Sequence, residues 1–181
     1  MTKQLIFGIG LNKTGTVSLT KALDLLGFPC MHHSRRVSKI TAANKAAGRL
    51  PLTSLTSTYT AFCDYPICLQ FEALDEAYPG SKFIYTTREL ASWIRSRRIQ
   101  FGGTVDYHTD VAADHAARVA AYFAERPEDI LTYDLCGGAG WAPLCRFLDV
   151  PVPSRNFPRK NVTTPKLRRR RRQQVRRRNR G

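Results

Sequence analysis

The sequence predicts an α/β fold in which a central parallel sheet is flanked by helices. Short apolar segments of strand length alternate along the chain with longer segments whose apolar residues recur at helical spacing. The first strand and helix are joined by a turn that contains glycine. With 181 residues, 43% of them hydrophobic, and no internal repeat, the chain is expected to form one well-buried domain. Ligands of such a sheet are expected at the carboxyl ends of its strands.

The first half of the chain provides two predicted strands. Gln4 to Gly8 is predicted to form a buried strand, and residues 16–27 form a helix that ends at Gly27. In the polar region that follows, Val37 to Ala47 is compatible with a helix, and "LPLTSLTSTYT" indicates a loop. Tyr59 to Cys63 is the next expected strand. A helix over residues 67–78 is expected after it, because Pro66 precedes this segment and proline is tolerated in a first helical turn.

The second half repeats the alternation after a turn at Pro79 and Gly80. Its expected elements are a strand over 82–86, a helix over 90–99, an amphipathic helix over 111–125, a strand over 129–133 and a helix over 141–148. We expect His108 and His115 to lie on the helix surface. Asp134, Trp141 and Cys145 are interpreted as strand-end and packing residues.

Positive charge is concentrated at the carboxyl end. The formal net charge is +15, and residues 166–181 contain ten Lys or Arg and no acidic residue. The remaining 19 basic and 14 acidic residues give the rest of the chain a net charge of +5. We therefore expect a folded domain over residues 1–165 and an arginine-rich tail over 166–181 that is disordered when free.

Five scattered cysteines lack the paired spacing of a zinc site. Buried free thiols in a reducing compartment are the favoured interpretation, with a metal site as the alternative. No apolar run reaches the roughly 18 residues of a membrane span. These features together predict a soluble cytoplasmic protein without a metal ion.

The first loop, "GIGLNKTGTVSL", is similar to a phosphate-binding loop but is not a Walker A motif. A Walker A motif places a second glycine after four intervening residues, and counted from Gly8 that position is Lys13. The loop still combines Lys13 and Gly15 with hydroxyl groups and leads into a helix N-terminus, which favours an anion. The alternative is a glycine turn with a capping threonine and a solvated lysine.

A second motif supports the first interpretation. "NKTGTVSL" resembles the 5′-phosphosulfate-binding loop of sulfotransferases that use 3′-phosphoadenosine 5′-phosphosulfate (PAPS). In that family, an arginine at the end of a later strand and a serine eight residues further on hold the 3′-phosphate. "FIYTTRELASWIRSRR" supplies Arg88 and Ser96 at this spacing. The alternatives are a surface ion pair of Arg88 with Glu89 or Asp75 and an exposed helix position for Ser96.

The resemblance covers residues 5–161, including "FCDYPICLQFEALDEAYPGSKFIYTTRE" and "GWAPLCRFLDVPVPSRNFPRKN". It implies a three-layer P-loop-like fold and transfer of a sulfuryl group from PAPS to a hydroxyl or amine of a small-molecule or glycan acceptor, with adenosine 3′,5′-bisphosphate as product. The chain departs from the family at Val17, where Thr or Ser is usual, and at Glu89, where Asp is usual. The residues expected to bind the donor are Lys13, Thr14, Gly15, Thr16, Val17, Ser18, Arg88, Ser96, Arg159 and Lys160.

Lys13 is the expected catalytic cation, because negative charge develops on the bridging oxygen of the departing bisphosphate. A general base is expected at His33 or its neighbour His32, or at Asp64 after a strand. For each of these the alternative is a structural role, which for Asp64 is a helix cap. Arg159 either closes over the 3′-phosphate together with Lys160 or begins the basic tail.

The arginine-rich tail leaves a rival function open. Such a segment binds nucleic acid or an anionic surface in a salt-dependent manner. The rival is a non-catalytic phosphonucleotide-binding domain tethered to nucleic acid by this tail. A kinase or NTPase is disfavoured because the Walker glycine and a clear Walker B carboxylate are missing.

Overall fold

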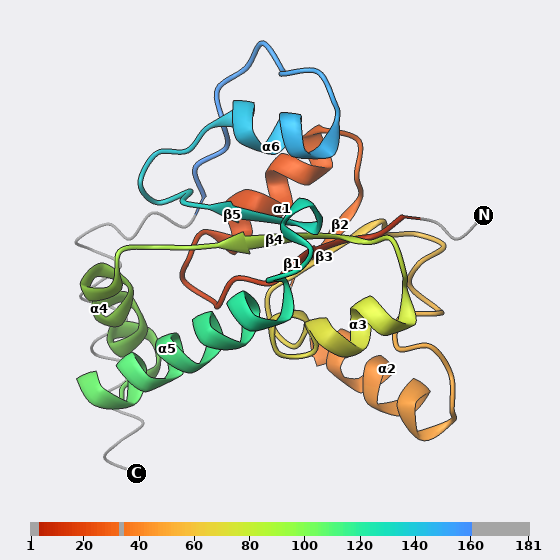
Figure 1. Cartoon of the computed structure of the whole chain (residues 1–181), viewed down its shortest axis with the longest axis horizontal. Helices are drawn as coiled ribbons and strands as arrows, with labels where there is room; N and C mark the ends of the chain where they lie inside the picture. The colour runs from red at the N-terminus through yellow and green to blue at the C-terminus, as the bar shows by residue number, and fades with distance from the viewer. Residues whose placement is uncertain (1–3, 33–34, 161–181) are drawn as a thin grey trace.

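The fold is built on a parallel sheet of five strands in the order β2-β3-β1-β4-β5 (Figure 1). The structure is a computed structural model and describes residues 4–32 and 35–160. The strands are β1 (Ile6–Gly8), β2 (Cys30–Met31), β3 (Ala61–Cys63), β4 (Lys82–Thr86) and β5 (Ile130–Tyr133). The α/β class with a parallel sheet is confirmed. The arginine-rich tail expected over residues 166–181 lies outside the described residues.

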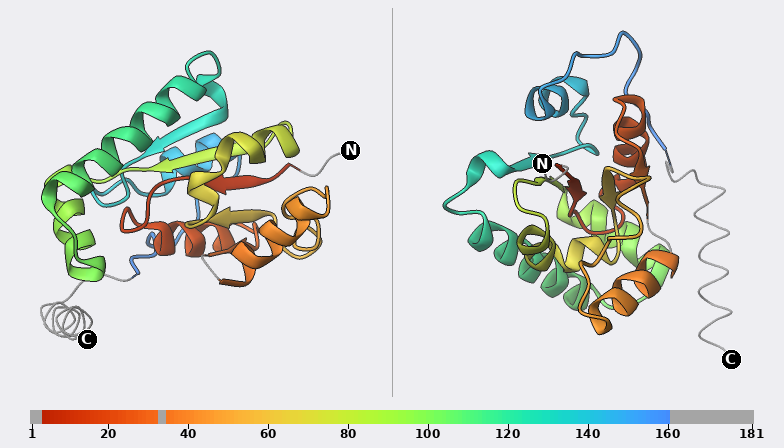
Figure 2. Two further views of the ribbon diagram at one scale, coloured as in Figure 1. Left: turned by 90° about the horizontal axis from the view of Figure 1, so that it is seen from below. Right: turned by 90° about the vertical axis from the view of Figure 1, so that its right-hand side faces the viewer.

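Helices cover both faces of the sheet and form the outer two of three layers (Figures 1 and 2). One face carries α1 (Thr16–Leu25) and α6 (Trp141–Leu148). The other carries α2 (Arg35–Ala46), α3 (Phe71–Ala77) and α5 (Val105–Tyr122). Helix α4 (Leu90–Phe101) lies beside α5 beyond the carboxyl end of β4. Two 3₁₀ turns, η1 (Ile67–Leu69) and η2 (Pro127–Asp129), complete the described elements.

A hydrophobic core lies on each face of the sheet, and successive side chains of β1 point alternately into one core and the other. Leu5, Phe7 and Ile9 are buried toward α2, α3 and α5, where aromatic rings surround them. Ile6 points to the opposite face and packs with Leu19 of α1 and the side chains of α6. Because successive strand residues point to opposite faces, an apolar strand without alternation is buried on both sides. The continuous run at the start of the sequence therefore places β1 at the centre of the sheet.

Three expectations about the helices were wrong. The helix expected over 67–78 is divided into η1 and α3, because Gln70 between them has φ −123° and ψ 21°, outside helical values. The helix expected from Val111 begins at Val105, where the Thr104 hydroxyl accepts the N–H of Tyr107 and caps it. His108 and His115 are 1% and 3% exposed rather than on the surface, because α5 packs against both α4 and the sheet.

The five cysteines are free thiols in the structure, and all but Cys136 are buried. The nearest pair, Cys30 and Cys63, lies with the sulfur atoms 3.5 Å apart. The described segments contain no group of three or more His, Cys, Asp or Glu side chains that could hold a metal ion. Among the described helices, none combines the length and apolar character needed to cross a bilayer.

Replacing Gly10 with alanine is expected to destabilise the protein by about 3 kcal/mol, because the added methyl group overpacks the first loop against β4. A Cβ atom at Gly10 would lie 1.9 Å from Thr86 Oγ1 and 2.4 Å from the Thr86 carbonyl oxygen. Urea unfolding measures the change. Gly140→Ala is the matched control, since nothing in the described part of the chain lies within 4 Å of its added methyl group. A Gly10→Ala variant as stable as Gly140→Ala would contradict the close packing.

Candidate functional site

Residues that follow all five strands meet at the carboxyl edge of the sheet. His32 comes directly after β2 and Asp64 directly after β3. The loop over residues 9–15 follows β1, Arg88 follows β4, and Leu135 follows β5. An ideal Cβ at Gly15 would lie 3.2 Å from the Leu135 Cβ, so the last strand's loop closes one side of the first loop. All five strands therefore contribute residues to the edge at which a ligand site is expected.

Side chains from α4 and α5 bind the carbonyl oxygens of the first loop. His115 Nε2 lies 2.8 Å from the Ile9 oxygen, and Trp93 Nε1 donates to the Asn12 oxygen at 2.9 Å. Arg88 Nη1 donates to the Lys13 oxygen at 3.0 Å. Because C=O and N–H point in opposite directions across a trans peptide unit, the N–H groups that follow Ile9 and Asn12 point away from these two helices. The loop is thus oriented to present N–H groups on its other side.

The turn into α1 has the features of an anion-binding site. Lys13 has φ 77°, and Gly15 has φ 103° and ψ 14° in the left-handed region, so the loop folds back tightly before the helix. Gly15 is the N-cap residue, no side chain of the described residues caps this end, and the first turn contains no acidic residue. Ser18 N–H donates to the Gly15 oxygen at 2.9 Å. The N–H groups of Thr16 and Val17 are therefore the first-turn donors without an acceptor in the helix, and the helix dipole makes this end positive. Lys13 lies two residues before Gly15 in the same turn.

The hydroxyl groups of the loop have different partners. Thr14 Oγ1 donates to the Leu11 oxygen at 2.6 Å and pairs with Thr86 Oγ1 at 2.6 Å, so its proton is already used to stabilise the turn. Ser18 Oγ accepts the N–H of Lys160 at 2.9 Å. This bond brings the chain around Lys160 to the first turn of α1, and the neighbouring Arg159 is exposed. Val17 is the second residue of α1, so its backbone N–H is one of the N–H groups at this end of the helix.

The second motif adjoins the first loop. Arg88 donates from Nε and Nη2 to Ser92 Oγ at 3.1 and 2.7 Å and from Nη1 to the loop, which leaves two of its five N–H donors. Ser96, one turn after Ser92, is 9% exposed. In the described part of the chain its hydroxyl has no hydrogen-bond partner, yet it is not cut off from solvent. Arg88 and Ser96 therefore retain the donors that a phosphate would need.

Glu89 and Asp75, the alternative ion-pair partners considered for Arg88, both bind other groups. Glu89 caps α4, accepting the N–H groups of Ala91 and Ser92 at 2.7 Å each, and these bonds lower the pKa of Glu89. Asp75 pairs with Arg126 at 2.7 Å. The replacement of the family's Asp by Glu89 thus leaves a functional helix cap.

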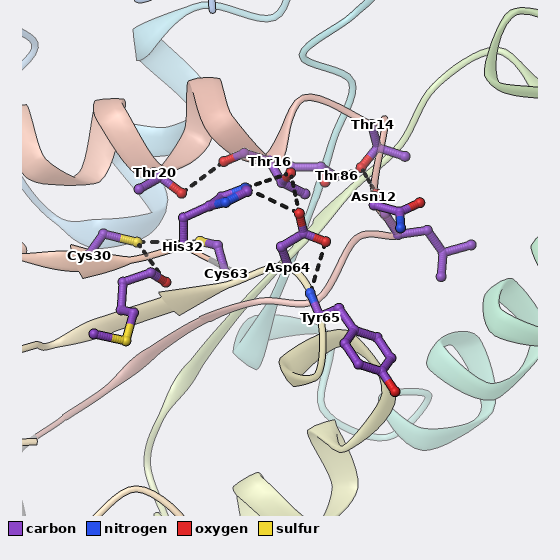
Figure 3. A network of polar contacts seen from close by, with 12 residues as sticks. Asn12, Thr14, Thr16, Thr20, Cys30, His32, Cys63, Asp64, Tyr65 and Thr86 are labelled. Carbon is purple, nitrogen blue, oxygen red and sulfur yellow. Dashed lines mark hydrogen bonds and ion pairs between the residues drawn. The ribbon is translucent and has the colours of Figure 1, made fainter. Parts of the chain in front are cut away.

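A third cluster joins the start of α1 to the ends of β2 and β3 (Figure 3). His32 Nε2 lies 3.2 Å from Asp64 Oδ2 and 3.1 Å from Thr16 Oγ1. Thr16 Oγ1 donates to the same carboxylate oxygen at 3.3 Å, and Asp64 Oδ1 accepts the N–H of Tyr65 at 2.8 Å. The structure thus joins two predicted base candidates in one network. His33, the other histidine candidate, lies outside the described residues.

Several residues of the site were not identified from the sequence: Asn12, Thr86, Ser92, Trp93, His115 and Leu135. Ser92 could have been found, because it lies four residues after Arg88 and shares a helix face with Ser96. Asn12 lies in the first loop itself and is bound by Trp93 and Arg97, and the remaining four bind or pack against this loop from distant positions in the sequence, which no local pattern indicates.

Comparisons with known proteins agree with the two motifs. The sequence model of a sulfotransferase domain matches residues 5–110 and 97–165 of the chain. A protein from Aspergillus versicolor named Ava biosynthesis cluster protein M is 26% identical over 204 residues. This similarity covers 83% of the present chain and 78% of the Aspergillus protein. The region that the sulfotransferase model matches contains the first loop, the second motif and the Thr16–His32–Asp64 cluster.

Proposed function

The chain belongs to the sulfotransferase domain family, and from this premise we propose that it transfers a sulfuryl group from PAPS to a hydroxyl or amine of an acceptor. The observation that carries the proposal is the pair of adjoining anion sites, the uncapped α1 N-terminus beside Lys13 and the Arg88–Ser96 pair. Two separated phosphate-binding groups suit a nucleotide with phosphates at both the 5′ and 3′ positions. The acceptor is proposed to be a small molecule or a glycan.

The donor-binding residues fit PAPS group by group. The N–H groups at the start of α1, with Lys13 and Ser18, would hold the 5′-phosphosulfate. Arg88 and Ser96 would hold the 3′-phosphate, joined by Arg159 and Lys160, whose segment is bound to Ser18. Thr14 and Gly15 shape the turn. PAPS supplies the sulfuryl group, and adenosine 3′,5′-bisphosphate is the leaving group, on whose bridging oxygen negative charge develops.

Lys13 is proposed to stabilise that charge. This role is supported by its position in the turn that leads into α1, whose positive end would act on the same atom. Fixed positive groups at the atom where charge develops are a major source of catalysis, because they need no reorganisation during the reaction. Arg88 helps indirectly, since its bond to the Lys13 oxygen orients the loop.

His32 and Asp64 are proposed to remove the acceptor's proton. Asp64 Oδ2 accepts from Thr16 and lies against His32 Nε2, which orients the imidazole with its hydrogen on Nε2. Nδ1 then carries the lone pair. It has no hydrogen-bond partner in the described part of the chain and is not buried from solvent. Nδ1 of His32 is therefore the proposed proton acceptor, and Asp64 stabilises the imidazolium that forms.

Binding of adenosine 3′,5′-bisphosphate tests the donor site. We expect the chain to bind the bisphosphate more tightly than ATP, because Arg88 and Ser96 recognise the 3′-phosphate. Arg88→Gln should weaken this binding about tenfold or more, since a charge-assisted hydrogen bond is lost. Isothermal titration calorimetry measures both. Arg95→Gln, an exposed residue of the same helix, is the matched control. Equal affinity for ATP and the bisphosphate would defeat the donor assignment.

The rival function is a non-catalytic phosphonucleotide-binding domain that its arginine-rich tail, residues 166–181, tethers to nucleic acid. The ten basic residues of this tail are the observation in its favour. The same titrations separate the two functions. Tight bisphosphate binding together with no turnover on a broad acceptor panel would support the rival, whereas turnover supports the transferase.

A further inference from the structure

Arg97 of α4 is a half-buried cation on the side of the first loop away from α1. Its guanidinium lies 5.3 Å from the ring centre of Trp93 and 4.6 Å from that of Phe101. Nη1 donates to Asn12 Oδ1. Helix α4 thus holds the guanidinium between two aromatic rings and against the loop, so its position is fixed.

The charge of Arg97 has no carboxylate partner at ion-pair distance within residues 4–32 and 35–160. Nε is buried without a hydrogen-bond partner, whereas Nη2 has no partner there but is not cut off from solvent. Burial lowers the pKa of Arg97, and the charges of Tyr107, Cys68 and Asp64 act in the opposite direction. A cation that has lost hydration without gaining a counter-ion is complementary to an anionic ligand.

The contact with Asn12 places Arg97 against the loop that follows β1, and the charges of Cys68 and Asp64 also act on its guanidinium. Cys68 belongs to η1, on the face of the sheet opposite α1, and burial followed by the charge of Asp64 raises its pKa to about 12. Asp64 belongs to the proposed base pair. Arg97 therefore lies at the same carboxyl edge of the sheet as the proposed base pair, since the loop that it binds follows β1 and Asp64 follows the neighbouring strand β3.

We propose that Arg97 binds a carboxylate on the acceptor, so that the acceptor class is a hydroxylated or amino-bearing organic acid. This inference rests on the transferase function proposed above. The open Nη1 and Nη2 hydrogens can form a fork with two carboxylate oxygens. Phe101, whose ring lies against the guanidinium, is 53% exposed, which suits an apolar acceptor body next to the acid group.

Matched aromatic probes test this proposal on the full chain. 4-Hydroxyphenylacetate and its neutral amide, 4-hydroxyphenylacetamide, are titrated by calorimetry with and without saturating adenosine 3′,5′-bisphosphate, followed by a short series of other aryl and alkyl acids with their amides. We expect the wild-type chain to prefer the acids about tenfold, because a charge-assisted pair forms. Arg97→Gln should remove the preference, and Arg97→Lys should retain part of it. Arg95→Gln should behave as wild type.

The outcomes separate this proposal from its alternatives. No acid preference in the wild-type chain, or a preference that persists in Arg97→Gln, overturns the acceptor role. A tenfold loss of bisphosphate affinity in Arg97→Gln without loss of acid preference would assign Arg97 to the donor instead. If circular dichroism shows that Arg97→Gln is unfolded, the Arg97→Lys variant takes its place in the test. A preference for acids in Arg97→Lys that equals the wild-type preference would then contradict the two-point contact between the guanidinium and a carboxylate. Acid preference without any bisphosphate binding would refute the PAPS proposal and leave the Arg97 site standing.

Discussion

Lys13→Ala is expected to lower the rate of sulfuryl transfer by about 10²- to 10³-fold, the loss that follows removal of one group that stabilises developing charge. The structure fixes the backbone of Lys13 at positive φ, directly before an uncapped helix N-terminus. In the proposed mechanism the helix dipole acts on the same charge as Lys13, and the dipole remains in the variant. The residual rate should exceed that of an unfolded or loop-deleted chain.

The test measures release of adenosine 3′,5′-bisphosphate from PAPS under single-turnover conditions with a panel of phenols and alcohols. Bisphosphate affinity should fall much less than the rate, because charge on the bridging oxygen is largest in the transition state. Lys21→Ala is the matched control, since Lys21 lies on α1 and pairs weakly with Asp24 at 3.9 Å. Turnover in Lys13→Ala within threefold of wild type would defeat this role.

The parts of the fold that could be predicted are those with a local physical signal. The continuous apolar run of β1 and the helical spacing of α1 indicated the correct elements, because burial on two faces and on one face produce different periodicities. The strand over residues 82–86 was placed with the observed bounds. The two motifs were recognisable because the first loop, the helix N-terminus and the arginine each lie within a few residues of a strand end.

The remaining features depend on contacts between distant residues. His115 lies on a helix 106 positions from Ile9, and its burial results from packing of α5 against Phe71, Tyr85 and the first loop. A single sequence shows an amphipathic helix there but not which polar residue turns inward. The break at Gln70 depends on how η1 and α3 pack under the sheet, which helix propensity does not encode.

The choice of general base depends on where β2 ends and on which side chains meet there. Sequence reasoning offered His33, His32 and Asp64 as separate alternatives, because it could not place the end of a two-residue strand. The structure joins His32 to Asp64, and the carboxylate also accepts from Thr16, the first residue of α1. The helix end that is proposed to bind the donor therefore contacts the proposed base pair, and we expect donor binding to affect the orientation of His32.

His32→Ala is expected to lower turnover about 10²- to 10⁴-fold for alcohol acceptors, the range lost when a general base is removed. The loss should be smaller for phenols of low pKa, because their proton leaves without help. A plot of rate against acceptor pKa, measured for both chains, therefore separates loss of a base from loss of structure. Added imidazole should restore part of the rate if the cavity left by His32 admits it.

Asp64→Asn provides the second part of this test. It should lower turnover without removing the imidazole, because a neutral amide at this position could not stabilise the imidazolium in the way that a carboxylate does. The double variant His32→Ala and Asp64→Asn should be little slower than His32→Ala alone, since Asp64 acts through His32. Independent, additive losses would show that Asp64 is itself the base. A loss confined to His33→Ala would assign the base to His33, and equal loss for all acceptors in His32→Ala would indicate a structural role, because only proton removal depends on acceptor acidity.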